Sequence, residues 1–192
     1  RRLQDRLGKL LGDGAAPEGL SFVTALPRGH EAIELLDGWA NDHPNARLVI
    51  VDVLRKVRPP TDVRASMYDG DYDVMSTLKN FADRRGIAVV VVHHTRKSVD
   101  EGDVFNEASG STGLTGAADA ILIAKKARNT SEAVLHVTGR DIHEGSHGLS
   151  FDQQTCSWQL LEEPAAALEQ STTRRRISEY LIGFPGDSPL DI

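Results

Sequence analysis

Two short apolar runs constrain the fold of this 192-residue chain more than any other feature of its sequence. The first run is Leu48 to Val51, and the second is Ile87 to Val92. Uninterrupted runs rich in β-branched residues are typical of strands buried on both faces of a sheet. Between them, residues 73–85 place apolar side chains at helical spacing. Two buried strands joined through a helix predict a parallel pair with a right-handed crossover, and therefore an α/β fold with a mostly parallel sheet.

Polar side chains follow both runs. Asp52 comes directly after the first run, and His93 and His94 come after the second. An unpaired carboxylate is costly inside a buried strand, so we expect Asp52 at the carboxyl end, which is the ligand-binding edge of open parallel sheets. There a carboxylate can assist a phosphate-bound Mg²⁺, and a neutral histidine can donate one hydrogen bond to a phosphate oxygen. Two alternatives stay open: Asp52 caps a turn, and the histidines end a strand without any ligand.

The composition is typical of one soluble globular domain. Apolar residues make up 40% of the chain and charged residues 26%, and the net charge of −6 argues against a protein that coats nucleic acid through bulk positive charge. The single cysteine, Cys156, excludes an intrachain disulfide and a cysteine-based zinc cluster, and it fits a reducing cytoplasm. No apolar run approaches the roughly 20 residues of a membrane span. The uncapped ends at Arg1 and Ile192 lead us to expect a fragment.

The remaining segments predict helices, hairpins and a linker. Helices are expected at 1–11, 31–41 and 173–183, a further strand at Ser21–Leu26, and a polar loop at 55–72. Gly86 stands where a glycine would end the helix at 73–85. Four short strands predict antiparallel hairpins appended to the parallel sheet: Ala120–Ala124, Ala133–Val137, Gly148–Phe151 and Ser157–Leu160. Residues 162–172 have the composition of a linker, and 173–192 resemble the start of a winged-helix domain.

Four motifs occur in a fixed order along the chain. They are Asp52, Val-Val-Val-His-His-Thr at 90–95, Gly-Ser-Thr-Gly-Leu-Thr-Gly-Ala-Ala-Asp at 110–119, and Thr-Gly-Arg-Asp at 138–141. With this set the chain resembles the C-terminal half of the ATPase domain of RepA-like, RecA-fold (AAA-type) P-loop ATPases, a family that includes hexameric replicative helicases. The resemblance implies a RecA-like three-layer sandwich over residues 1–161, with a mostly parallel sheet, appended antiparallel strands and an incomplete N-terminal half.

The resemblance also implies roles for three side chains. Asp52 matches the Walker B aspartate that holds Mg²⁺ through water, and His94 matches the residue that senses the γ-phosphate of ATP. Both would therefore bind the nucleotide. Arg140 matches an arginine that is supplied to the nucleotide of a neighbouring subunit. The alternative for Arg140 is a surface ion pair with Asp141 or Glu144.

Two basic segments are candidates for contacts with phosphates. Residues 95–112 match a loop that faces DNA in the central channel of a ring, where Arg96 and Lys97 can contact single-stranded DNA. A solvated loop is the alternative, because several acidic residues follow Lys97. A second basic cluster comes soon after Asp52 and can contact nucleotide, DNA or an adjacent subunit, or simply be solvated: Arg55, Lys56 and Arg58.

The acidic residues Asp69, Asp71 and Asp73 have the spacing that begins an EF-hand loop. That interpretation fails, because position six of the loop is Val74 rather than glycine and position twelve is Asn80 rather than glutamate. We therefore expect these aspartates to be loop residues and an N-cap for the helix that follows.

The sequence contains no Gly-x-x-x-x-Gly-Lys-Ser/Thr phosphate loop. We expect the full-length parent to hydrolyse ATP and this chain alone to be inactive. The leading hypothesis is part of an ATP-driven DNA helicase or translocase that forms a homo-oligomeric ring, for example a hexamer. The first alternative is a non-catalytic DNA-binding or regulatory module on a RecA-like scaffold. The second is a RecA-fold ATPase that acts as a signalling or recombination switch.

Overall fold

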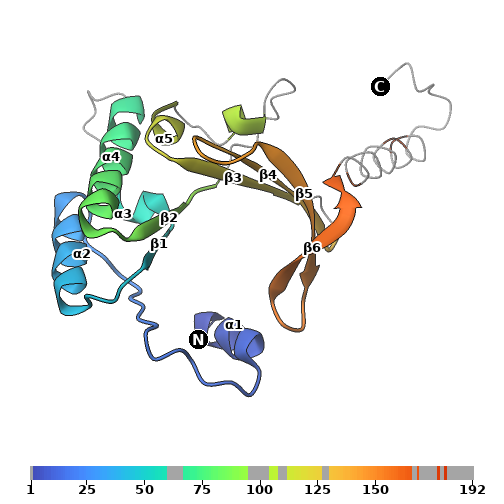
Figure 1. Cartoon of the computed structure of the whole chain (residues 1–192), viewed down its shortest axis with the longest axis horizontal. Coiled ribbons are helices and arrows are strands. Elements are labelled where there is room, and N and C mark those ends of the chain that lie inside the picture. Colours follow the sequence, from blue (N-terminus) through green and yellow to red (C-terminus); the bar gives the residue numbers. More distant parts are fainter. Residues whose placement is uncertain are drawn as a thin grey trace. The chain divides into compact units, whose positions relative to one another are not determined.

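The computed structural model describes residues 2–59, 67–94, 104–107, 112–126 and 130–165, together with residues 168, 177 and 180 (Figure 1). The chain divides into two compact units. One unit comprises residues 17–121, and the other comprises residues 1–16 with 122–192. None of the helices formed by the described residues is long and apolar enough to cross a membrane.

The unit of residues 17–121 contains a parallel strand pair with helices. Its elements are α2 (His30–Asp42), β1 (Leu48–Asp52), α3 (Leu54–Val57), α4 (Met67–Arg85), β2 (Ala88–Val92), the 3₁₀ helix η1 (Val104–Glu107) and α5 (Thr112–Gly116). β1 and β2 are parallel, in a register that runs from Leu48 opposite Ala88 to Asp52 opposite Val92. The predicted pair of parallel strands joined through a helix is confirmed.

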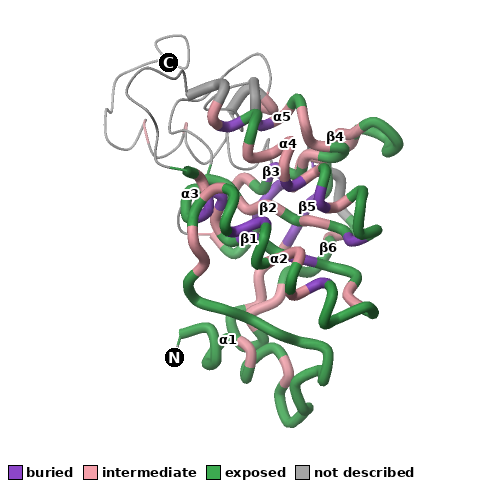
Figure 2. Tube along the Cα trace, turned by 90° about the vertical axis from the view of Figure 1, so that its left-hand side faces the viewer, coloured by how far each residue is buried: buried purple, intermediate pink, exposed green. Residues whose placement is uncertain are grey.

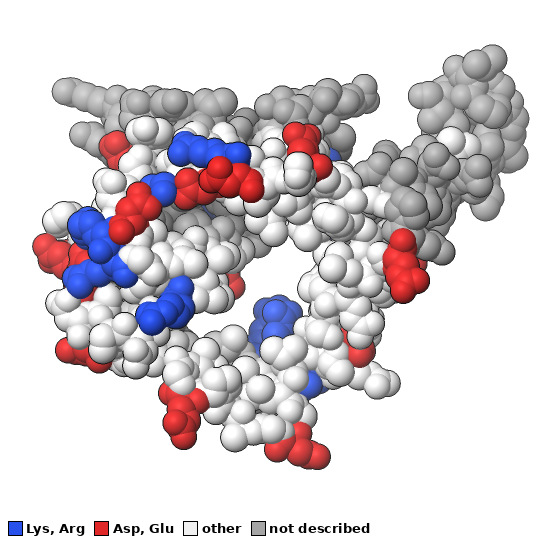
Figure 3. All heavy atoms as spheres, viewed as in Figure 1, with Lys and Arg blue, Asp and Glu red and all other residues white. Residues whose placement is uncertain are grey.

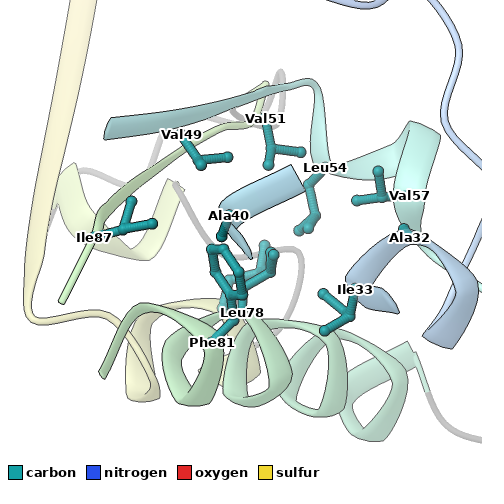
Figure 4. Packing of buried hydrophobic residues seen from close by; sticks show 11 residues of the cluster. Ala32, Ile33, Ala40, Val49, Val51, Leu54, Val57, Leu78, Phe81 and Ile87 are labelled. Atoms are coloured by element: carbon teal, nitrogen blue, oxygen red, sulfur yellow. The ribbon is translucent and has the colours of Figure 1, made fainter. Parts of the chain in front are cut away.

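The core of this unit lies between α2, α4 and one side of the strand pair (Figure 4). Leu78 and Phe81 project from α4 toward β1, where Val49 and Val51 are buried. Phe81 has no exposed surface, and full burial of such a side chain stabilises the fold by about 1.5–3 kcal/mol. The apolar residues at 73–85 therefore pack into the core, as their helical spacing predicts.

The prediction that the first strand is buried on both faces is wrong. Burial alternates along β1, and Leu48 and Ile50 are 50% and 61% exposed. The reason is that the described helices of this unit supply core side chains only to the side of Val49 and Val51. An uninterrupted apolar run does not by itself reveal which of its faces is covered.

The segment from Leu54 to Met67 also differs from the expected polar loop. α3 forms at its start, and α4 begins at Met67, six residues before the predicted helix at 73. The interpretation of Asp71 and Asp73 as loop and cap residues is therefore wrong, because both lie inside α4. Asp71 is buried within the helix and forms an ion pair with Arg58. The local sequence does not reveal this tertiary contact. Residues 60–66 lie outside the described part.

The strand predicted at Ser21–Leu26 does not form. Phe22 and Val23 are 53% and 70% exposed, and no described strand lies beside them to pair with their backbone groups. Apolar residues favour extended structure only when a neighbour satisfies the N–H and C=O groups. Gly86, in contrast, has a positive φ of 62° directly after α4, as a helix-ending glycine should.

The other unit contains an antiparallel sheet. Its elements are α1 (Arg2–Leu11), most of β3 (Ala120–Lys126), β4 (Glu132–Gly139), β5 (Gly145–Asp152) and β6 (Ser157–Pro164). The strands follow the order β3-β4-β5-β6, and the β4–β5 and β5–β6 pairs are antiparallel, which confirms the predicted hairpins. β6 runs on to Pro164, into the segment proposed as a linker. The limits of the domains stay predictions, and most of residues 173–192 lie outside the described part.

Candidate functional site

The carboxyl ends of β1 and β2 form one edge. Asp52 is the last residue of β1 and is in register with Val92, the last residue of β2. His93 and His94 follow Val92 directly. The sequence-based expectation that an acid and an imidazole end two neighbouring strands at the same edge is therefore confirmed. The catalytic and ligand-binding roles assigned to Asp52 and His94 stay predictions.

Strand alternation assigns Asp52 to one side of this edge. Val51 faces the core, so Asp52 faces the opposite side, and it is exposed there. Paired residues of parallel strands share a side, so Val92 faces the same way as Asp52. His93 and His94 lie beyond the end of β2, and both are exposed.

The surroundings of His93 shift its pKa. Partial burial of the imidazole lowers the pKa of His93 below its ordinary value of 6.5, and the positive charges of Arg58 and His94 lower this pKa further. Arg58 therefore lies close enough to the end of β2 for its charge to act on His93. A neutral imidazole results near pH 7, because each of these three causes disfavours the protonated form.

A buried ion pair joins the end of α3 to α4. Arg58 follows α3 and pairs with Asp71 in the second turn of α4. Among the described residues, Asp71 is the one charged residue that is buried. Sequence reasoning missed this pair, although a signal exists: Asp71, Val74, Leu78 and Phe81 follow a 3-4-3 spacing, which places Asp71 on the buried stripe of α4.

Asp52 has the chemistry of a residue that assists a magnesium ion. It presents an exposed carboxylate, and carboxylate oxygens and water are the ligands that Mg²⁺ prefers. A single carboxylate is sufficient when the contact runs through a water molecule. In the part of the chain that the structure describes, no three His, Cys, Asp or Glu side chains gather as ligands of a directly bound metal. The peptide bond between Asp52 and Val53 is cis.

An apolar hollow of this unit is lined by neither Asp52 nor His94. It has a volume of about 180 Å³ and is lined mainly by α2 and α4, with Val51, Val57 and Pro59 beside them. Its lining is mostly aliphatic, and neither Asp52 nor His94 takes part. It therefore belongs to the core side of the strand pair, and we assign no nucleotide to it.

The remaining predicted site residues lie elsewhere in the chain. Arg140 is exposed and comes directly after β4, in the unit that contains the antiparallel sheet. Its assigned role in a neighbouring subunit's site stays a prediction. Arg96 and Lys97 lie outside the described residues, as does most of the proposed DNA-facing loop. Residues 104–107 of that loop form η1, and residues 112–116 of the glycine-rich segment form the helix α5.

Comparisons with known proteins agree with this geometry. A solved structure described as an ATPase domain matches with a TM-score of 0.59 and 16% identity, over 71% of this chain and 52% of that chain. A second solved structure is described as a DnaB-like replicative helicase and its interactions with primase. It matches with the same TM-score and identity, over 71% of this chain and 36% of that one. The chain thus spans about half or less of the length of these structures. Among curated proteins, no match was found.

At this level of identity the likeness concerns the fold. It confirms the RecA-like α/β class, in which a parallel pair and an antiparallel sheet occur together. A sequence model of one family, described as "AAA domain", matches residues 1–100. That match includes β1, β2 and the edge formed by Asp52 and His94. Because it extends over more than half of the 192 residues, this chain belongs to the AAA domain family.

Proposed function

We propose that this chain is part of an ATP-dependent DNA helicase or translocase of a replication module. In the full-length protein, ATP is hydrolysed at the interfaces of a homo-oligomeric ring in the cytoplasm. The observation that carries the proposal is the register of β1 and β2, which brings Asp52 and the residues after Val92 to one edge. The family match and the fold shared with an ATPase domain and a replicative helicase support the same function.

Each candidate residue has its own role in this proposed function. Bound Mg²⁺ would supply positive charge to the phosphoryl group during its transfer. Asp52 would hold this ion by accepting a hydrogen bond from one of its water molecules, and His94 would donate a hydrogen bond to the γ-phosphate. Arg140 acts on the nucleotide of the adjacent subunit, where a guanidinium stabilises the transition state. Arg96 and Lys97 contact the phosphates of single-stranded DNA.

The first test replaces the carboxylate in the full-length protein that contains this chain. Asp52→Asn is expected to lower ATP turnover about 10- to 100-fold, because a residue that orients a metal-bound water typically contributes that much. Asp42→Asn, at the exposed end of α2, is the matched control and should leave turnover unchanged. If Asp52→Asn hydrolyses ATP as fast as the wild type, the edge is not the hydrolytic site.

The second test asks whether Arg140 acts across an interface. Arg140→Ala is expected to lower turnover by about 10³- to 10⁵-fold. Mixed with Asp52→Asn subunits, it should recover part of the activity, because some interfaces then combine an intact Asp52 with an intact Arg140. Mixtures without any recovery would show that Arg140 does not act between subunits.

The alternative function is a non-catalytic DNA-binding or regulatory module. It predicts a full-length protein that binds single-stranded DNA, has no ATP turnover and does not respond to Asp52→Asn. The isolated 192-residue chain does not separate the two functions, because its sequence lacks a phosphate loop and we expect no turnover from it in either case.

A further inference from the structure

The ion pair between Arg58 and Asp71 has a position that packing alone does not explain. The two side chains are 21% and 2% exposed. Asp71 occupies a place on the buried stripe of α4 that Val74, Leu78 and Phe81 continue with apolar groups. A buried ion pair seldom stabilises a fold more than apolar residues of similar size do, because both charges must leave water. An apolar pair would therefore serve the core at least as well.

The cation of this pair lies near the candidate nucleotide edge. Only the short helix α3 separates Arg58 from Asp52 and Val53, and the backbone N–H of Arg58 donates to the carbonyl of Leu54 across 3.1 Å. The charge of Arg58 acts on His93, directly after β2. Arg58 therefore belongs to the segment that directly follows the carboxyl end of β1, and its charge also reaches the residue after β2.

Arg58 keeps donors that Asp71 does not use. A guanidinium has five N–H groups, and one carboxylate accepts at most two of them in the parallel geometry. The Nε of Arg58 is buried and has no hydrogen-bond partner among the described residues. About a fifth of the side chain is exposed. Because Asp71 fixes the orientation of the guanidinium, the remaining donors are held ready for an anionic oxygen with little further loss of conformational freedom.

We propose that Arg58, held by the buried Asp71, binds a phosphate oxygen of the nucleotide at the carboxyl edge of β1 and β2. The ligand class is a nucleoside polyphosphate, and the inference rests on the function proposed above. Asp71 is a positioning residue, because it acts only through Arg58.

The test measures binding of a non-hydrolysable ATP analogue, with Mg²⁺, to the full-length protein by calorimetry. The central variant combines Arg58→Met with Asp71→Leu, which removes both charges together and so avoids an unpaired buried carboxylate. We expect this variant to melt no lower than the wild type and to bind the analogue about 10- to 100-fold more weakly. Its affinity for adenosine should not change, since adenosine lacks the phosphates.

Two further variants separate binding from support of the fold. Arg58→Lys keeps the charge and should recover part of the affinity, although it loses the paired donors. Arg47→Met is the matched control, because Arg47 stands just before the amino end of β1 and hydrogen-bonds only nearby carbonyls in the described structure. It should bind the analogue as the wild type does.

Failure of this inference can be distinguished from failure of the proposed function. If the double variant folds and binds the analogue as tightly as the wild type, while Asp52→Asn still lowers turnover, Arg58 is not a phosphate ligand and the ATPase assignment stands. If the wild type itself does not bind the analogue, both are wrong. Equal losses of affinity for the analogue and for adenosine would also contradict a contact with phosphate.

Discussion

The two units of the chain bury their apolar residues to different extents. In residues 17–121, buried side chains from α2, β1, α3 and α4 form one cluster around Phe81. In the other unit, the described cluster is small and consists of Val134, Ala165 and Leu168 with Leu161 beside them. There Trp158 and Leu160 on β6 remain 44% and 69% exposed. The candidate nucleotide edge therefore belongs to the unit with the larger cluster of buried residues among those that the structure describes.

The helix α1, in the unit with the antiparallel sheet, is also largely exposed. It carries no buried residue, although its leucines form an apolar stripe, and Leu3 and Leu10 are 53% and 56% exposed (Figure 2). Sheet hydrogen bonds between β4, β5 and β6 hold the antiparallel unit together, with one ring contact between Phe151 and Trp158 at 4.9 Å. Among the described residues, strand pairing is thus the main contact of this unit, whereas a side-chain cluster is prominent in residues 17–121.

Substitution in the two units should reveal this difference most clearly. Phe81→Ala is expected to lower the free energy of unfolding by about 3–5 kcal/mol, because it leaves a cavity in a closed core. Leu160→Ala, in the exposed part of β6, should change it by less than about 0.5 kcal/mol. Urea denaturation followed by circular dichroism measures both values. Similar losses for the two variants would mean that the units are packed equally well.

Ion pairs on the surface between α2 and α4 contribute less to stability than the core does. Positive and negative side chains alternate over the surface near α2 and α4 (Figure 3). Asp37 on α2 accepts from Arg84 at 2.8 Å and from Arg85 at 2.7 Å, both on α4. Asp37→Asn is expected to lower the free energy of unfolding by about 1 kcal/mol, since a network of partly exposed pairs contributes about that much.

The control for this prediction is Glu34→Gln on the same helix. Glu34 lies 3.6 Å from His30, and both side chains are highly exposed. Its replacement should change stability by no more than a few tenths of a kcal/mol. If both variants unfold at the same urea concentration as the wild type, the ion pairs between α2 and α4 do not contribute to the packing of this unit.

The sequence predicts what local periodicity determines and misses what tertiary contacts determine. The apolar runs identify β1 and β2, and the stripe at 73–85 together with Gly86 identifies the end of α4. The same information does not show that Leu48 and Ile50 are exposed, because coverage of a strand depends on distant helices. Asp71 is missed for a related reason: its burial depends on Arg58, which is thirteen positions away in the chain.

The sequence likewise predicts only part of the candidate site. Neighbouring parallel strands must end at a common edge, so the placement of Asp52 and the two histidines follows from two strand assignments. The lowered pKa of His93 does not follow, because it depends on burial and on a guanidinium from another element. The position of Arg140 relative to this edge depends on a partner subunit, which no property of a single sequence specifies.

The titration of His93 tests the electrostatics of the unit of residues 17–121. Its pKa is lowered below 6.5 by partial burial and then by Arg58 and His94. The unfolded chain therefore binds a proton first as the pH falls, and the contribution of this residue to stability, complete above about pH 6.5, decreases below it. NMR titration should place the midpoint of His93 below 6.5, and the double variant Arg58→Met with Asp71→Leu should raise it. An unchanged midpoint in that variant would show that Arg58 does not act on the imidazole.

The smallest expected effect concerns the turn between β5 and β6 in the antiparallel unit. The carboxylate of Asp152 accepts hydrogen bonds from the backbone N–H of Gln154 at 2.8 Å and from the hydroxyl of Thr155 at 2.9 Å. These bonds lower the pKa of Asp152 below its ordinary value of 3.8, the bond from Gln154 most of all. The turn is therefore stabilised above about pH 3.8, and this stabilisation is lost as the pH falls through the lowered pKa.

Carboxyl NMR titration should give Asp152 a midpoint below 3.8, and Thr155→Val should raise that midpoint by removing one donor. Global unfolding should hardly respond near pH 7, because the side chain is exposed to solvent and the turn lies outside both clusters. A midpoint at or above 3.8 would mean that the turn is not held by its aspartate. The turn would then depend on the strand pairing on either side of it rather than on hydrogen bonds to its carboxylate.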